Sequence, residues 1–198
     1  MKTSNMRIDL IIGPMFAGKS SKLIQTIKRY VIMGKKCIII NTVLDTRCDQ
    51  VVKTHDNSTY AAVKYSKLME FYATEEYKTC EVIGIDEAQF FDDLVDFVHL
   101  AEADNKTMII AGLNGNIDRK PMGQIPQLIG MVDSIKLLKA VSASDENNTD
   151  AIFSVRESNM DPDVIIPGGK ELYRAVTRNE FLEIKNRKQS WFTNFEKW

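Results

Sequence analysis

The chain has 198 residues, of which 44% are hydrophobic and 27% are charged, a composition that suits one α/β domain with a small appendage. Its formal net charge of −1 provides no broad positive surface for nucleic acid. No apolar run is long enough to span a membrane, and the first residues lack the apolar core of a secretory signal. We therefore expect a cytoplasmic protein that binds neither nucleic acid nor a membrane.

Continuous apolar runs alternate with amphipathic segments over the first 140 residues. Such runs are typical of strands that are buried on both faces of a parallel sheet, and they occupy residues 8–12, 37–40, 82–85, 108–111 and 134–138. Helical periodicity predicts helices over residues 19–33, 65–73 and 94–103. This alternation predicts the α/β class, with a doubly wound parallel sheet flanked by helices.

The character of the sequence changes beyond residue 140. Short strands are predicted at 152–155 and 164–166, separated by turns. We divide the chain into a nucleotide-binding domain (1–140), a small β subdomain (141–182) and a tail (183–198) that either docks as a helix or stays mobile. Polar loops at 45–59 and 114–124 follow predicted strands, where ligands bind in open α/β sheets. The three cysteines lack paired spacing and are most simply reduced thiols.

A phosphate-binding pattern follows the first predicted strand. The pattern G-x-x-x-x-G-K-[ST] is matched by Gly13, Pro14, Met15, Phe16, Ala17, Gly18, Lys19 and Ser20. Glycines at both ends allow a tight turn whose backbone N–H groups face phosphate oxygens, and a helix start places its positive dipole end there. Lys19 can reach the β- and γ-phosphates of ATP, and the Ser20 hydroxyl can bind Mg²⁺. A chance glycine turn is the alternative, but the flanking strand and helix patterns argue against it.

A second candidate element lies where the 82–85 run ends in two carboxylates, Asp86 and Glu87. Beside a P-loop, Asp86 can hold Mg²⁺ through water, and Glu87 can serve as a base on a hydroxyl or on water. An acidic pair on a surface turn is the alternative. The letters Asp86-Glu87-Ala88-Gln89 also resemble the acidic box of nucleic-acid-dependent ATPases, although such motors need about two domains of this kind or a partner.

The motifs taken together resemble the type II thymidine kinase family over about residues 8–173. Besides the two elements above, the resemblance rests on Asp45-Thr46-Arg47, Thr54-His55-Asp56 and Arg119-Lys120-Pro121. It implies a RecA-like P-loop core with a small lasso-type subdomain. It also implies Mg²⁺-dependent transfer of the γ-phosphate of ATP to the 5′-hydroxyl of thymidine, and of deoxyuridine, in nucleotide salvage. A homotetramer that is inhibited by thymidine triphosphate is implied as well.

The resemblance also implies roles for particular residues. Glu87 would be the general base, Arg47 would stabilise charge on the transferring phosphoryl group, and Asp45 would lie near the metal. Gln89 is grouped with the residues that bind the nucleotide. The residues that would contact thymidine are Met15, Phe90, Leu113, Ile117, Met122, Ser154, Ile166 and Tyr173. Core packing is the alternative for the apolar ones. Ile117 and Met122 replace aromatic residues of the family. This loses about 0.5–1.5 kcal/mol per ring pair, and we expect either weaker thymidine affinity or broader specificity.

The sequence departs from the family at its structural zinc site. The four cysteine positions hold Ser142, Asp145, Thr177 and Glu180. Because hydroxyls are poor zinc ligands and two carboxylates cannot rebuild a closed thiolate site, we predict no structural zinc. Two other functions stay open at this point, a nucleic-acid-stimulated ATPase and a nucleotide-binding scaffold without transfer activity. The presence of Glu87 and Arg47 favours the kinase.

Overall fold

The computed structural model describes residues 6–45, 51–53, 59–142, 149–156 and 172–195. Arg47, Asp145 and Ile166 lie outside these residues, as do the predicted strand at 164–166 and the segment 54–56. Among the described residues, no helix combines the length and the apolar character needed to cross a membrane.

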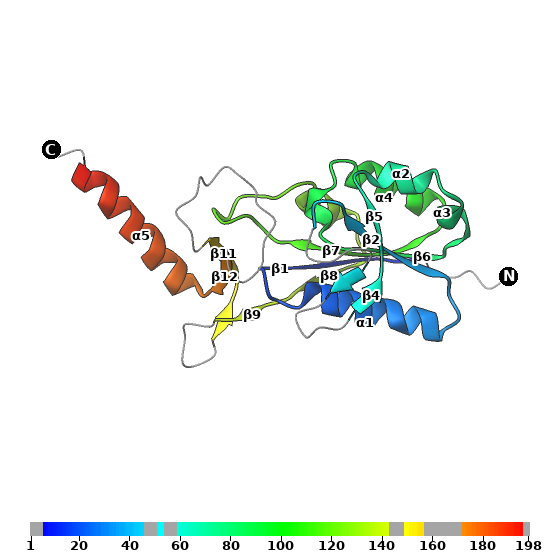
Figure 1. The fold of residues 1–198 in the computed structure, drawn as a ribbon, viewed down its shortest axis with the longest axis horizontal. Coiled ribbons are helices and arrows are strands. Elements are labelled where there is room, and N and C mark those ends of the chain that lie inside the picture. The colour runs from blue at the N-terminus through cyan, green and yellow to red at the C-terminus, as the bar shows by residue number, and fades with distance from the viewer. Residues whose placement is uncertain (1–5, 46–50, 54–58, 143–148, 157–171, 196–198) are drawn as a thin grey trace.

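A six-stranded parallel sheet forms the centre of the molecule (Figure 1). Its spatial order is β5-β2-β6-β7-β1-β8. The strands are β1 (Ile8–Gly13), β2 (Cys37–Thr42), β5 (Val63–Tyr65), β6 (Val82–Ile85), β7 (Thr107–Leu113) and β8 (Ser134–Leu137). Every residue of β6 is buried, as the continuous apolar run predicts for a strand covered on both faces. The predicted α/β class and all five predicted strands are confirmed, and β5 is an addition.

Helices cover both faces of this sheet. One face carries α1 (Lys19–Ile32), whose Leu23, Ile24 and Ile27 are buried against it. The other carries α2 (Leu68–Tyr72), α3 (Glu75–Thr79) and α4 (Leu94–Ala103), which pack around an aromatic cluster (Figure 1). Within this cluster, the Phe71 ring lies 5.6 Å from the Tyr77 ring and 6.3 Å from the Phe97 ring, centroid to centroid.

The prediction of one helix over 65–73 is wrong at its start. Tyr65 ends strand β5, and the helix begins only at Leu68. Tyr65 lies three positions before Leu68, in phase with the helical stripe, so the local pattern could not separate them. Val63–Tyr65 pairs with β2 and is therefore a strand. The region predicted as a polar loop at 45–59 also contains most of a short hairpin, β3 (Val51–Lys53) and β4 (Thr59–Ala61).

The last part of the chain forms two small antiparallel pairs and a helix. The elements are β9 (Ala140–Val141) with β10 (Asp150–Ala151), β11 (Phe153–Arg156) with β12 (Tyr173–Val176), and α5 (Arg178–Phe195). The strand predicted at 152–155 is β11, displaced by one residue. The tail is helical as far as Phe195, and its docking stays a prediction. α5 continues across residue 182, and its C-terminal end points away from the central sheet (Figure 1). The division into domains stays a prediction.

Two of the three cysteines lie in the described part of the chain. Cys37 and Cys80 are free thiols, as expected, and lie at the start of β2 and at the end of α3. Burial raises the pKa of the Cys37 thiol to about 11, which keeps it in its unreactive protonated form at neutral pH.

Candidate active site

The two predicted chemical elements lie at the same edge of the sheet. The P-loop follows the carboxyl end of β1, and Asp86 and Glu87 follow the carboxyl end of β6. β7 pairs with both strands and therefore separates them by two inter-strand spacings, about 10 Å. This distance leaves room for a triphosphate between the loop and the carboxylates.

The P-loop adopts an unusual backbone. Gly18 precedes α1 with a φ of 77°, and Phe16 has a φ of 64°, in the left-handed region that costs a side chain energy. At Gly13, an added Cβ would lie only 2.5 Å from the carbonyl oxygen of Leu138. The Lys19 ammonium is almost buried and donates a hydrogen bond of 2.8 Å to the carbonyl oxygen of Pro14. This hydrogen bond holds the Lys19 side chain against the P-loop, where it would bind phosphate.

The small subdomain contacts the P-loop directly. The Met15 backbone N–H donates to the Ser154 hydroxyl of β11 at 2.9 Å. Phe16 and Ala17 pack against a buried cluster of three alanines, Ala140, Ala151 and Ala175. The structure therefore brings together Met15 and Ser154, which the sequence assigned separately to the thymine pocket and to its covering loop.

Three acidic residues follow the carboxyl ends of the neighbouring strands β2 and β6, although no three Asp, Glu, His or Cys side chains of the described residues form a ready metal site. Asp45 and Asp86 are 8% and 2% exposed, and Asp45 Oδ2 accepts a 2.9 Å hydrogen bond from Asn41 Nδ2. Glu87 has a φ of 51°, a left-handed turn between β6 and the 3₁₀ helix η1 (Ala88–Phe90). One oxygen of Glu87, Oε2, accepts a 2.7 Å hydrogen bond from Gln89 Nε2. The two buried aspartates and Ser20 supply oxygen atoms at this edge that can act as metal ligands.

A cavity of about 140 Å³ opens between the loop after β7 and strand β11. Its lining residues are Asn114, Gly115, Asn116, Arg119, Ile152, Phe153 and Ser154. Of the predicted substrate residues, Ser154 lies on this wall. Phe90, Leu113 and Ile117 are half-buried and Met122 is buried, while the Tyr173 hydroxyl accepts a 3.0 Å hydrogen bond from Arg156. The assignment of these residues to thymidine stays a prediction.

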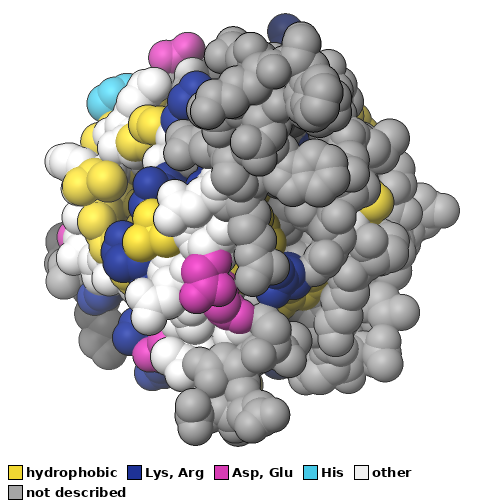
Figure 2. All heavy atoms as spheres, turned by 90° about the vertical axis from the view of Figure 1, so that its left-hand side faces the viewer, with side chains coloured by type: hydrophobic (Ala, Val, Ile, Leu, Met, Phe, Trp, Pro, Cys, Tyr) yellow, Lys and Arg dark blue, Asp and Glu magenta, His cyan; other side chains and the backbone are white. Residues whose placement is uncertain are grey.

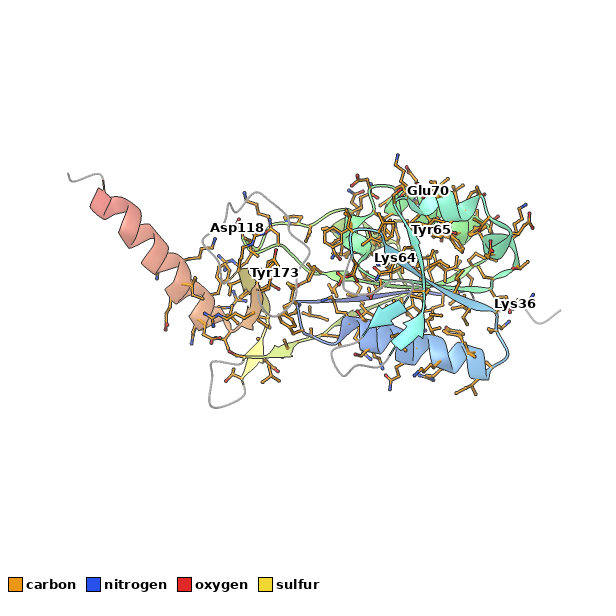
Figure 3. The ribbon with its side chains drawn as sticks, in the orientation of Figure 1. Lys36, Lys64, Tyr65, Glu70, Asp118 and Tyr173 are labelled. Atoms are coloured by element: carbon orange, nitrogen blue, oxygen red, sulfur yellow. The ribbon has the colours of Figure 1, made fainter. Side chains whose placement is uncertain are left out.

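The loop after β7 is held by α5, which sequence reasoning missed. The Arg119 guanidinium lies 4.5 Å from the centre of the Phe181 ring and 5.5 Å from that of Phe153. Asp118 forms an ion pair with Lys185, and Figure 3 shows Asp118 at the same end of the molecule as Tyr173. No local pattern could reveal these contacts, because they join segments more than 30 residues apart.

Three of the four positions that hold zinc cysteines in the family are joined here by hydrogen bonds. The Ser142 hydroxyl donates to both carboxylate oxygens of Glu180, at 2.9 and 3.0 Å. The Thr177 N–H donates to Glu180 Oε2 at 2.6 Å, and the Glu180 N–H donates to the Thr177 hydroxyl at 3.3 Å. Thr177 and Glu180 thus form a capping box at the start of α5, and Ser142 ties it to β9.

We expect this polar cluster to stabilise the small subdomain without metal. Replacing Ser142 with alanine should lower the free energy of unfolding by about 1 kcal/mol, because the half-buried carboxylate of Glu180 loses a hydrogen-bond donor. Urea denaturation measures the change, and Ser66→Ala is the control, since Ser66 donates to Glu70 at an exposed site. A chelator should not alter unfolding of the unmodified protein. Stoichiometric zinc in the purified protein would contradict the metal-free interpretation.

Comparison with known proteins identifies the family. A family model described as thymidine kinase matches residues 6–181, which include the P-loop, the acidic residues and the small hairpins. The thymidine kinase of Myxoma virus (strain Uriarra) is 41% identical over 172 residues, which are 87% of this chain and 94% of that protein. The thymidine kinase of Vaccinia virus (strain Western Reserve) is 36% identical over 176 residues, or 89% and 97% of the two chains. The chain therefore belongs to the thymidine kinase family.

Proposed function

We propose that this chain transfers the γ-phosphate of ATP to the 5′-hydroxyl of thymidine, with Glu87 as the general base. The observation that carries the proposal is the placement of Glu87 and the P-loop at two strand ends separated by one strand, inside the region that matches thymidine kinases. Neither a nucleic-acid-stimulated ATPase nor a scaffold protein gains support from the family match.

In the proposed step, Glu87 takes the proton of the 5′-hydroxyl as that oxygen bonds to the γ-phosphorus. The bond from the γ-phosphorus to the bridging oxygen breaks, ADP leaves, and thymidine monophosphate is formed. Lys19 would exchange its bond to the Pro14 carbonyl for one to the phosphates. Arg47 would neutralise charge on the transferring group. Phosphoryl transfer needs this positioning and charge neutralisation more than covalent help.

The oxygen donors at the sheet edge fit a magnesium ion. Ser20 offers a hydroxyl, and the buried carboxylates of Asp45 and Asp86 are the hard oxygen ligands that Mg²⁺ prefers. These residues would hold the ion, partly through water. When bound, Mg²⁺ supplies charge neutralisation to the β- and γ-phosphates.

Association between copies of the chain is part of the proposal. On β8, the edge strand of the sheet, Ile135 and Leu137 are 44% and 56% exposed, and Val141 of β9 is 60% exposed. Exposed apolar edges of this kind are usually covered, which supports the homotetramer. Sedimentation equilibrium tests it, and a monomer at all concentrations would contradict it.

The remaining proposals concern regulation and location. Thymidine triphosphate carries the base of one substrate and the triphosphate of the other, so it would occupy both subsites and inhibit; activity that is insensitive to it would contradict this. Figure 2 shows Lys and Arg side chains of the described residues interspersed with hydrophobic and acidic ones at the α5 end. The formal net charge of −1 supports an enzyme without a nucleic-acid partner, which filter binding at low salt would test, and a cytoplasmic location remains part of the proposal.

The proposed function is tested by following Mg²⁺-ATP-dependent phosphorylation of thymidine, deoxyuridine and deoxycytidine side by side. We expect thymidine and deoxyuridine monophosphates. Because Ile117 and Met122 replace rings, we expect the preference for thymidine to be modest. Folded protein that binds ATP but phosphorylates none of the three nucleosides would overturn the proposal.

A further inference from the structure

A buried glutamine connects the acidic turn to the end of the next strand. Gln89 is 4% exposed. Its Nε2 donates to Glu87 Oε2 at 2.7 Å, and its Oε1 accepts from the Leu113 backbone N–H at 3.0 Å. One planar amide therefore contacts the proposed base and the last residue of β7.

The surroundings leave this glutamine little freedom. An added Cβ at Gly123 would lie 2.2 Å from the backbone oxygen of Gln89, and one at Gly112 would lie 3.0 Å from its Oε1. Both glycines thus permit close approach to the glutamine, one at its main chain and one at its side chain. Because both polar ends of the amide are bonded and the space around it is filled, the amide has a defined orientation.

We propose that Gln89 is a positioning residue that sets the orientation of the Glu87 carboxylate relative to the nucleoside pocket. The inference rests on the proposed function, in which Glu87 is the general base. Glu87 itself has a left-handed backbone and lies beyond the end of β6, so strand pairing does not fix its side chain. The hydrogen bond from Gln89 holds one carboxylate oxygen of Glu87. The hydrogen bond from Leu113 holds the Gln89 amide next to a residue of the predicted thymidine pocket. A base that is misplaced by an ångström can cost about 100-fold in rate.

Two substitutions distinguish the hydrogen bond that Gln89 donates to Glu87 from the space that the Gln89 side chain fills. Gln89→Glu keeps the volume and an oxygen for the Leu113 N–H, but replaces the donor with a carboxylate that faces Glu87. Gln89→Met keeps the approximate length and removes both polar atoms. We expect each to lower kcat for thymidine about 10- to 100-fold. The KM for ATP should change by no more than about twofold, because the two amide ends bond Glu87 and Leu113 and not the P-loop. A larger rise in the KM for ATP would instead favour the sequence-based grouping of Gln89 with the nucleotide-binding residues.

Tyr77→Phe is the control for the loss of a buried polar contact. The Tyr77 hydroxyl donates to Asp104 Oδ2 at 2.6 Å, and Tyr77 lies on α3, which leads into the start of β6, whereas Glu87 follows the end of that strand. This substitution should lower thermal stability and leave kcat unchanged. An equal fall in kcat for Tyr77→Phe and Gln89→Met would overturn the inference.

A double-mutant cycle tests whether Gln89 acts through Glu87. If it does, adding Gln89→Met to Glu87→Gln should change single-turnover rates by less than about twofold; independent, multiplicative losses would show a merely structural role. Unmodified protein that does not phosphorylate thymidine would overturn the proposed function itself. Thymidine kinase activity that needs Glu87 but is unaffected by either Gln89 variant would overturn the inference alone.

Discussion

Glu87→Gln should lower kcat for thymidine phosphorylation by about 10²- to 10⁴-fold, the usual contribution of a general base. Glutamine has nearly the same size and cannot accept the proton of the 5′-hydroxyl. The effect should appear in kcat rather than in the KM for ATP, because the P-loop residues that would contact the triphosphate are unchanged. Steady-state kinetics with both substrates varied, together with ATP binding by calorimetry, measures the two effects separately.

Glu70→Gln provides the control for this substitution. Glu70 lies on α2, where it accepts a hydrogen bond from Ser66 at the exposed surface, well away from the small subdomain (Figure 3). Its replacement should leave kcat unchanged. A Glu87→Gln enzyme with full activity would show that another group takes the proton.

Lys106→Met should produce the largest loss of stability among the substitutions considered. The Lys106 ammonium is buried and donates to the carbonyl oxygens of Tyr77, Lys78 and Cys80, at 2.9, 3.2 and 2.7 Å. These carbonyls lie at the end of α3, where the helix dipole also favours a cation. Because they lose a charged donor together, we expect the free energy of unfolding to fall by about 3 kcal/mol.

Urea denaturation followed by circular dichroism measures this change, and Lys78→Met is the matched control. The Lys78 side chain is 62% exposed and pairs with Glu75 on the surface, so its loss should be small. Thymidine kinase activity of folded Lys106→Met protein should be retained, because α3 is remote from the P-loop in the fold. Equal stabilities for the two lysine variants would refute the capping role of Lys106.

The sequence predicts those parts of the fold that depend on local patterns. β6 and α4 have the predicted bounds, because a fully apolar run and a clear helical stripe each allow one interpretation. Tyr65 was misassigned because its position fits the stripe of α2, while its pairing with β2 is a contact between distant segments. The hairpin β3–β4 escaped notice because its strands are only three residues long.

In the candidate site, too, the parts that are contiguous in sequence are predictable and the contacts between distant segments are not. The P-loop is contiguous in sequence, so spacing alone locates it, and β1 and α1 flank it as the motif requires. The partner of Gln89 on β7 is 24 residues away, and the ion pair that joins α5 to the loop after β7 spans 67 residues. Such contacts depend on how the elements pack, which periodicity and spacing do not encode. The roles of Arg47 and Ile166 stay predictions.

The left-handed backbone at Glu87 lowers the stability of the fold at the position to which we assign the chemistry. A non-glycine residue with a φ of 51° costs about 1–2 kcal/mol relative to glycine, and asparagine also tolerates this region. Glycine or asparagine at residue 87 would therefore raise the free energy of unfolding, and under the proposed function it would remove the general base. The strained backbone at residue 87 and the proposed proton transfer therefore depend on the same side chain.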